Sequence, residues 1–355
     1  MTIAFYAPLK SPKHPVPSGD RAMARAILAA LEHGGFDVSL VSELRIYDKF
    51  GDVGEQARLA SAAKLEVARL LADPAVSLWR AWVTYHNYYK APDLIGPAVC
   101  EGLGIPYFQV ESTRARKRLS GPWAEFAHAA EAASDAAHTI FYVTQRDAET
   151  LRRDAPDGQN LIHLPPFLAR AKMPPKSTRT GPMLSVGMMR PGDKLASYRL
   201  IADALAHLPQ GLDWALEIAG DGPVRAEVAD IMSPFQKRVT LLGALDAEPL
   251  EKAYAQASLF FWPGVNEAFG LVYLEAQAAG LPVVAQDRPG VCDVVYGRHP
   301  DPQEGPKAMA HQIAHLLSND VERNQTGRAA RNMVVSRHLI GAAVAKLKSV
   351  LGPVL

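Results

Sequence analysis

Along almost the whole chain, short apolar runs alternate with longer segments in which apolar positions recur at the spacing of a helix. The short runs are rich in β-branched and aromatic residues, which predicts strands, whereas the longer segments predict amphipathic helices. The predicted strands cover residues 2–7, 37–42, 79–86, 105–110, 138–144, 183–189, 214–220, 238–243, 258–263 and 282–285. The predicted helices cover 20–35, 91–104, 122–137, 194–208 and the segment that ends at Gly280. This alternation predicts an α/β fold of parallel sheets covered by helices and joined by right-handed crossovers.

The alternation breaks near residues 165–182, where proline, serine and basic residues gather. Such a composition is typical of a linker, and a chain of 355 residues exceeds what one hydrophobic core usually serves. We therefore expect two doubly wound, Rossmann-like domains that face a cleft. The expected divisions are 1–168 for the first domain, 169–182 for the linker, 183–336 for the second domain and 337–355 for a C-terminal helix that can pack back on the first domain.

The charge and the cysteines of the chain narrow the class of protein. Lys and Arg number 38 against 37 Asp and Glu, a formal charge of +1, which argues against a nucleic-acid-binding role. Cys100 and Cys292 lie far apart, which suits a reducing compartment and indicates neither a disulfide framework nor a zinc site. No stretch approaches the roughly 20 apolar residues of a membrane-spanning helix. We expect a cytoplasmic protein, with peripheral contact to the inner face of the membrane left open.

The first loop to inspect follows the strand at 2–7, because ligands of parallel sheets bind beyond the carboxyl ends of strands. It reads PLKSPKHPVPSGD and runs into a helix start, where free N–H groups suit phosphate and Gly19 admits close approach of a ligand. The alternative is an ordinary surface loop in which Asp20 caps the helix.

Two loops of the second half carry further signals. Arg190 and Lys194 flank a proline-glycine turn after a strand, where they can bind a diphosphate or remain solvated charges. Gly220 and Gly222 also follow a strand, but the third glycine of a dinucleotide fingerprint is missing, because Arg225 stands there. A tight turn is therefore favoured over a nicotinamide site.

The strongest signal is the segment NEAFGLVYLEAQAAGLPVVA, which places Glu267 and Glu275 in a mostly apolar helical region. A carboxylate is costly to desolvate without a partner, so we expect a ligand to satisfy both acids. Carboxylates accept hydrogen bonds from hydroxyl pairs, and a helix start near Phe269, Gly270 and Leu271 offers N–H groups to phosphate. A nucleotide sugar combines these features.

The spacing of these two acids resembles the signature of GT-B glycosyltransferases of the family 4 kind, which transfer a sugar from a nucleotide diphosphate donor with retention of configuration. The similarity continues through VGMMRPGDK, LEIAGDGP, VTLLGALDAEPLEKAYAQASLFFWP and RPGVCDVV. It extends more loosely through PSGD, ILAALEHGGFDVSLVS and HNYYKAPDLIGPAVCEGLGIPY, and so covers nearly the whole chain.

The resemblance implies roles for the cations and for the first glycine. Arg190 and Lys194 would neutralise the donor diphosphate and stabilise the departing nucleotide, and Gly19 would pack against the phosphates. The resemblance also implies no cofactor and no obligatory metal ion, because the cations and the helix ends act on the leaving group. No convincing DxD-like pair for a metal occurs in the sequence.

The resemblance implies roles for the two acids as well. Glu267 would hold hydroxyls of the transferred sugar, with the backbone N–H groups of Phe269, Gly270 and Leu271 nearby. Glu275 would bind the ribose of the nucleotide. The first domain would receive the acceptor, and the second would bind the donor.

The first half departs from the family pattern at one position. The family histidine after the strand at 105–110 falls at Ser112, and the nearest ionisable residue is Glu111. Either Glu111 contacts sugar or acceptor, or this segment caps a helix and the site differs. His86, after the preceding strand, is either a substitute for the missing histidine or a structural residue.

A basic segment, STRARKRLSGPW, follows the same strand. It is either a solvated loop or a surface for a phosphorylated acceptor or an anionic membrane. Its four cations are Arg114, Arg116, Lys117 and Arg118.

The resemblance thus implies a retaining, metal-independent hexosyltransferase that uses a UDP- or GDP-sugar. Its acceptor is a saccharide, a lipid-linked molecule or a small molecule. Two alternatives stay open: a nucleotide-sugar epimerase of the same fold, and a non-catalytic subunit that binds a nucleotide sugar.

Overall fold

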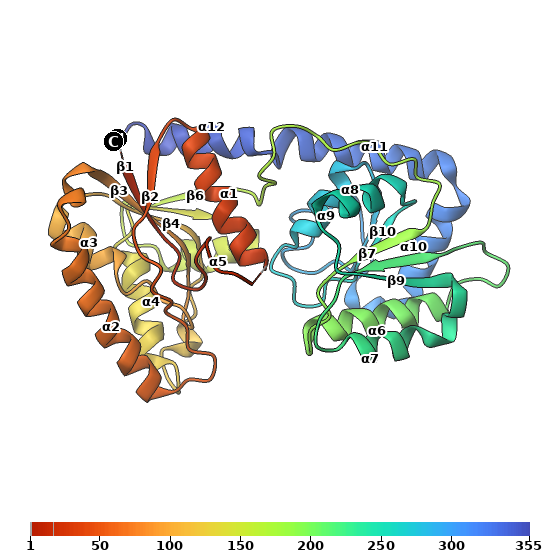
Figure 1. Ribbon diagram of the computed structural model, residues 1–355, viewed down its shortest axis with the longest axis horizontal. Helices are drawn as coiled ribbons and strands as arrows, with labels where there is room; N and C mark the ends of the chain where they lie inside the picture. Colours follow the sequence, from red (N-terminus) through yellow and green to blue (C-terminus); the bar gives the residue numbers. More distant parts are fainter. Residues whose placement is uncertain (1, 17) are drawn as a thin grey trace. The chain divides into compact units, whose positions relative to one another are not determined.

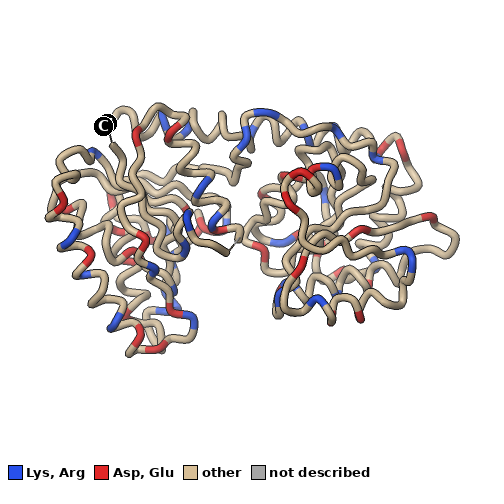
Figure 2. The backbone as a smooth tube through the Cα atoms, in the orientation of Figure 1, with Lys and Arg blue, Asp and Glu red and all other residues tan. Residues whose placement is uncertain are grey.

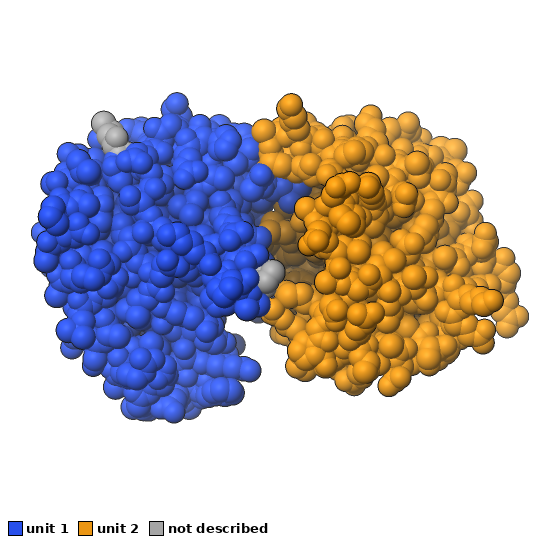
Figure 3. Space-filling model, viewed as in Figure 1, with its two compact units in different colours: residues 1–169, 340–355 blue, residues 170–339 orange. Residues whose placement is uncertain are grey.

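A computed structural model describes residues 2–16 and 18–355. The chain divides into two compact units, one formed by residues 1–169 and 340–355 and the other by residues 170–339 (Figures 1 and 3). Each unit contains one parallel sheet with helices packed on it. The predicted α/β class with two doubly wound sheets is confirmed.

Unit 1 is built on a six-stranded parallel sheet with the order β2-β1-β3-β4-β5-β6. Its strands are β1 (Thr2–Tyr6), β2 (Asp37–Leu40), β3 (Trp79–Asn87), β4 (Tyr107–Ser112), β5 (Thr139–Tyr142) and β6 (Asn160–His163). Its helices are α1 (Gly19–His33), α2 (Val53–Leu71), α3 (Gly96–Leu103), α4 (Ala124–Asp135), α5 (Gln145–Asp154) and α12 (Ile340–Leu351). Every residue of β1, β4 and β5 is buried, as expected for strands covered on both faces.

Unit 2 is built on a five-stranded parallel sheet with the order β11-β10-β7-β8-β9. Its strands are β7 (Met183–Val186), β8 (Leu216–Ala219), β9 (Val239–Gly243), β10 (Phe260–Phe261) and β11 (Val283–Val284). Its helices are α6 (Asp193–Ala206), α7 (Arg225–Met232), α8 (Ala247–Gln256), α9 (Leu271–Ala278), α10 (Gly305–Ser318) and α11 (Asp320–Arg337). Short 3₁₀ helices of the chain cover Pro74–Leu78, Arg116–Arg118, Ser233–Arg238 and Pro302–Glu304.

Ser18 caps helix α1, and Asp20 does not. The Ser18 side chain accepts a hydrogen bond from the N–H of Arg21 at 3.2 Å, and Gly35, with φ of 87°, follows the helix end. The alternative in which Asp20 serves as the cap is therefore wrong. Its carboxylate is free to face another partner, His86.

The segment expected as a linker belongs to unit 2 and is fixed there. Ser177 is buried, and its hydroxyl donates a hydrogen bond to the carbonyl of Ala257 at 2.5 Å. Arg179 donates to Asn324 Oδ1 at 2.6 Å. Residues 170–182 are therefore held to unit 2 at Ser177 and Arg179, while other residues of the segment, such as Lys172 and Lys176, are exposed to solvent.

The end of the chain returns to unit 1. Helix α11 packs against α9 within unit 2, whereas α12 packs beside α1 within unit 1 (Figure 1). The buried residues of α12, among them Ile340, Ala343 and Leu347, recur every three or four positions and form the face that packs. Residues 340–355 thus complete the first unit.

Charged residues of both signs are interspersed along the backbone of both units (Figure 2). Within the described residues, every helix is either too short or too polar to cross a membrane.

Candidate functional site

Lys194 and Glu267 form an ion pair at the carboxyl ends of β7 and β10 in unit 2. Glu267 Oε1 also accepts a hydrogen bond from Trp262 Nε1 at 2.9 Å, and Lys194 Nζ lies 5.3 Å from the centre of the Trp262 ring. The side chains of Lys194 and Glu267 keep only 27% and 13% exposure. Two of the predicted site residues therefore meet, because β10 and β7 are neighbours in the sheet.

The loop that carries Glu267 is fastened to helix α6 at two further points. The N–H of Val265 donates to Ser197 Oγ at 3.2 Å, and Asn266 Nδ2 donates to Asp193 Oδ2 at 3.3 Å. Asn266 has φ of 53°, a conformation that is costly for a residue other than glycine and that recurs at functional sites. The position of the Glu267 carboxylate is thus set by α6 as well as by its own strand.

Glycines let the loops around this ion pair pack directly against each other. A Cβ atom at Gly187 would lie 2.7 Å from the Trp262 ring, and one at Gly220 would clash with the carbonyl of Gly187. Gly290, with φ of 86°, packs in the same way on the backbone of Ala268. The glycine at 220 therefore serves close packing of loops, which agrees with its interpretation as a turn residue.

Two helices of unit 2 begin next to this loop. Helix α6 begins after Gly192, and helix α9 begins after Gly270, both with positive φ. Both N-cap residues are glycines, which have no side chain to accept a hydrogen bond from the first N–H groups, so the helix ends keep their partial positive charge available for an anion. Arg190 is exposed just before α6, whereas Phe269 is buried just before α9.

Glu275 lies in helix α9 and contacts helix α8. The Tyr254 hydroxyl donates to Glu275 Oε2 at 3.0 Å. Burial raises the pKa of Glu275, while the Tyr254 hydrogen bond and the charge of Arg170 oppose that rise. Together with the partners of Glu267, this corrects the argument that the two acids need a ligand, because the protein already supplies a donor to each.

Unit 1 brings together three of the residues considered at the ends of its strands. His86 and Glu111 end the neighbouring strands β3 and β4, between the paired residues Tyr85–Val110 and Asn87–Ser112. Both have positive φ, 68° and 60°, which marks them as strained positions. His86 Nδ1 lies 3.2 Å from Asp20 Oδ1 of helix α1.

The charges in this group perturb one another. Burial alone would lower the pKa of His86, but the charge of Glu111 and the hydrogen bond and charge of Asp20 raise it to about 9. Burial raises the pKa of Glu111 to about 7, against the opposing charge of His86. Burial would also raise the pKa of Asp20, yet its contact with His86 lowers it. His86 is therefore a cation held between acids at neutral pH.

Asp147 is a member of this group that the sequence patterns did not reveal. It stands in the first turn of α5 and accepts hydrogen bonds from Thr144 Oγ1 at 2.6 Å and Thr113 Oγ1 at 3.2 Å. Burial raises its pKa, and its charge acts on both His86 and Glu111. The signal that could have revealed Asp147 is its position just after the predicted strand at 138–144.

Ser112, where the histidine of the family pattern would fall, does not lie beside His86 and Asp20 but faces the core. It is fully buried, and its hydroxyl lies 2.9 Å from Ser134 Oγ. Glu111 lies in strand β4, so the interpretation of this segment as a helix cap is wrong.

A Cβ atom at Gly19 would meet no atom within 4 Å apart from its chain neighbours and its own helix, so packing does not require glycine there.

The basic segment is partly internal. Arg114 keeps 3% of its side chain exposed and pairs with Glu131 at 2.9 Å and Asp135 at 2.6 Å. Arg116 pairs with Asp154, and Arg118 lies over the rings of two aromatic residues, while Lys117 is exposed. Arg114 therefore cannot contact a membrane or a ligand, which corrects its place in the predicted surface.

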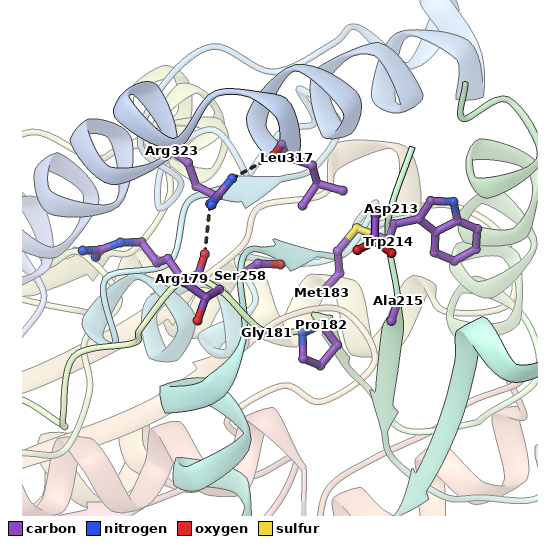
Figure 4. Close-up of a pocket in the computed structure, with 11 residues that line it drawn as sticks. Arg179, Gly181, Pro182, Met183, Asp213, Trp214, Ala215, Ser258, Leu317 and Arg323 are labelled. Atoms are coloured by element: carbon purple, nitrogen blue, oxygen red, sulfur yellow. Dashed lines mark hydrogen bonds between the residues drawn. The ribbon is translucent and has the colours of Figure 1, made fainter. Parts of the chain in front are cut away.

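A cavity of about 380 Å³ opens at the other edge of the unit 2 sheet (Figure 4). It is lined at the amino ends of β7 and β8, by residues that include Met183, Asp213 and Ala215, and by Ser258 before β10. In Figure 4, Arg323 bridges the carbonyls of Arg179 and Leu317. The cavity is thus separate from the Lys194–Glu267 pair, which stands at the carboxyl ends.

Among the described residues, no group of three or more His, Cys, Asp or Glu side chains has the arrangement of a metal site.

Solved structures identify the class of fold. HepE of Anabaena, in complex with UDP and glucose, matches with a TM-score of 0.71 and 16% identity over 99% of this chain and 100% of that chain. The fold is therefore GT-B.

Sequence comparisons show which proteins the second unit is similar to. Residues 182–319 match the family described as Glycosyl transferases group 1. The sulfoquinovosyl transferase SQD2 of Arabidopsis thaliana is 33% identical over 145 residues, which cover 38% of this chain and 27% of that protein. The GDP-mannose-dependent alpha-mannosyltransferase of Mycolicibacterium smegmatis is 32% identical over 139 residues, covering 38% of this chain and 35% of that protein. The resemblance to GT-B glycosyltransferases of the family 4 kind is confirmed, and the matches span about a third or less of these relatives' lengths.

Proposed function

We propose that the chain is a retaining glycosyltransferase that moves a hexosyl group from a UDP- or GDP-sugar to an acceptor alcohol. The observation that carries the proposal is the Lys194–Glu267–Trp262 group, which stands beside two uncapped helix starts within the segment that matches the glycosyltransferase family. A cation, a carboxylate and free N–H groups are what a sugar diphosphate requires. Both nucleotides stay in the proposal, since HepE binds UDP and the mannosyltransferase is named for GDP-mannose.

Each residue of the proposed donor site has one role in binding the donor. Arg190 and Lys194 hold the diphosphate, aided by the N–H groups of Phe269, Gly270 and Leu271 at the start of α9. Glu267 accepts hydrogen bonds from hydroxyls of the sugar. When the donor binds, the Lys194 ammonium can move from Glu267 to the phosphate, because the lysine side chain is flexible and changes rotamer easily.

Two further donor contacts complete the proposed site. Glu275 accepts hydrogen bonds from the ribose, in competition with Tyr254. Gly19 is assigned to the phosphates by the family resemblance, and a Cβ atom at this position would meet no atom within 4 Å apart from its chain neighbours and its own helix.

The reaction needs stabilisation of the leaving nucleotide above all. As the bond between the anomeric carbon and the phosphate oxygen breaks, negative charge grows on the diphosphate, where Arg190 and Lys194 act. The acceptor oxygen attacks from the face that the nucleotide leaves, so the configuration is retained, and the proton of the acceptor hydroxyl passes to the departing phosphate oxygen. The proposal assigns no metal, no cofactor and no side-chain nucleophile.

A donor screen followed by a transfer assay tests this function. Thermal-shift measurements with UDP-glucose, UDP-galactose and GDP-mannose should show one donor that stabilises the chain by mass action. Glu267→Ala should abolish most transfer while the chain stays folded, with Glu248→Ala, at an exposed position of helix α8, as the control. Near-normal transfer by Glu267→Ala would refute the assignment of Glu267, and an epimerised donor or donor binding without turnover would refute the transferase function.

The acceptor surface and the location of the protein are part of the same proposal. We propose a saccharide, lipid-linked or small-molecule acceptor, a cytoplasmic protein, and contact with anionic membrane through Arg116, Lys117 and Arg118. Charge reversal at Lys117 should weaken cosedimentation with vesicles that contain phosphatidylserine; unchanged cosedimentation would eliminate the membrane contact.

A further inference from the structure

Unit 1 contains a carboxylate oxygen for which the described residues supply no partner. Glu111 is 7% exposed, and its Oε2 atom receives no hydrogen bond from the described chain. A buried carboxylate oxygen without a donor is costly, and native proteins rarely keep one without a use. Glu111 also keeps φ of 60°, which adds to the cost of holding it there.

The groups around Glu111 are mainly acids. Asp20 approaches from helix α1 and Asp147 from helix α5, and the charges of both act on Glu111. His86 stands between the acids as the one cation of the group, with Tyr88 stacked on its ring at 4.7 Å between ring centres. Like charges at close range oppose one another, so this arrangement favours an additional positive group.

The cations farther out do not fill this role. Lys10 acts on Asp20, and Arg146 acts on Asp147, each on the acid beside it. Glu111, by contrast, is buried beside Tyr85, and its opposing charge comes from His86. Tyr85 is a hydrogen-bond partner of the Glu111 carboxyl group, but the Oε2 atom still lacks a donor among the described residues.

Resting on the proposed function, we propose that Glu111, Asp147 and Asp20 form an acceptor subsite for a protonated amino group, so that the acceptor is an amino sugar or another ammonium-bearing polyol. An ammonium group has three N–H donors and no acceptor. It gives Glu111 Oε2 the missing hydrogen bond and offsets the repulsion among the acids. A neutral hydroxyl supplies the hydrogen bond but not the charge.

Three sugars that differ at one substituent test the subsite. D-glucosamine, N-acetyl-D-glucosamine and D-glucose are titrated into the full chain by calorimetry at pH 7. Charge-assisted hydrogen bonds are about twice as strong as neutral ones, so we expect glucosamine to bind at least about tenfold more tightly than either neutral sugar. Equal affinity for glucosamine and N-acetylglucosamine would overturn the proposal.

Variants locate the preference on the proposed residues. Glu111→Gln keeps the shape of the side chain and removes its charge, so the preference for glucosamine should fall to about threefold or less. Asp147→Asn should reduce it as well, which gives a second test if one variant folds poorly in a melting experiment. Glu149→Gln removes an exposed charge from the same helix and should retain the preference. An unchanged preference in both Glu111→Gln and Asp147→Asn would overturn the subsite.

Donor binding, measured by thermal shift with UDP-glucose and GDP-mannose, separates this inference from the proposed function. If a donor binds and its sugar is transferred, but the three sugars are not discriminated, the subsite is wrong and the transferase function stands. If glucosamine is preferred and no donor binds, the subsite stands and the transferase function is wrong.

Discussion

Replacing Glu111 with glutamine should make the stability of unit 1 less dependent on pH. Burial raises the pKa of Glu111 from 4.5 to about 7, so between these values the folded chain holds a proton that the unfolded chain has released. A folded state that binds more protons than the unfolded state loses stability as pH rises. Glu111 therefore destabilises unit 1 increasingly from pH 4.5 upward, and the full cost is present above pH 7.

The magnitude follows from the two pKa values. The interval from 4.5 to about 7 corresponds to about 3 kcal/mol, at about 1.4 kcal/mol for each pH unit. The contribution of His86 to stability also falls as pH rises, between pH 6.5 and about 9. Burial opposes the rise of the His86 pKa from 6.5, but Glu111 and Asp20 raise that pKa to about 9. The stabilisation by His86 is complete below pH 6.5 and is lost as pH rises through about 9. Glu111 is the strongest of the charges that raise the pKa of His86. The substitution Glu111→Gln therefore also lowers that pKa and the pH range over which the stabilisation by His86 is lost.

Hydrogen exchange of peptides from β3 and β4 measures the opening free energy of unit 1 separately from unit 2. Between pH 5 and pH 8, the opening free energy of Glu111→Gln should rise by about 3 kcal/mol relative to that of the wild type. Glu149→Gln, which removes an exposed carboxylate, should follow the wild-type curve. Parallel curves for Glu111→Gln and the wild type across this range would refute the assignment of a buried, perturbed carboxyl group.

Three further predictions concern stability. A double-mutant cycle with Lys194→Met and Glu267→Gln should give a coupling of about 1–3 kcal/mol in the urea unfolding of unit 2, and additive effects would show that the pair is not coupled. Arg114→Ala should cost about 3 kcal/mol because it leaves acids without their buried cation, whereas Lys117→Ala should change stability by less than about 0.5 kcal/mol; equal losses would contradict the different burial of the two residues. Gly290→Ala should destabilise unit 2 by at least about 2 kcal/mol, because a Cβ would clash with the adjacent loop at positive φ, and a wild-type melting temperature would contradict this close packing.

The hydrophobic pattern was sufficient for much of the fold, because the spacing of buried positions is a local property. Alternation of short apolar runs with spaced ones predicted parallel sheets, and the expected strands at 2–7 and 105–110 overlap β1 and β4. Helix α2 was not predicted. Its exposed side includes Val53 and Leu65, which blur the contrast between its faces.

The candidate site in unit 2 was predictable in its parts and not in its contacts. The sequence selected Lys194 and Glu267 because both follow strands, yet it assigned each to a ligand. The structure pairs them with each other across 73 positions of sequence, because β10 lies next to β7 in the sheet. It also brought in Trp262, whose indole N–H completes the group.

By itself, the sequence determined which residues stand at strand ends, since that depends on local periodicity and on the turn residues beside it. Only the tertiary structure decided that Asp20 leaves the role of helix cap and meets His86, that Asp147 joins them from another helix, and that Glu111 keeps an unpaired oxygen. The reason is physical: the charge and pKa of a side chain depend on burial and on neighbours that strand order brings together, and neither is written in the spacing of residues along one segment.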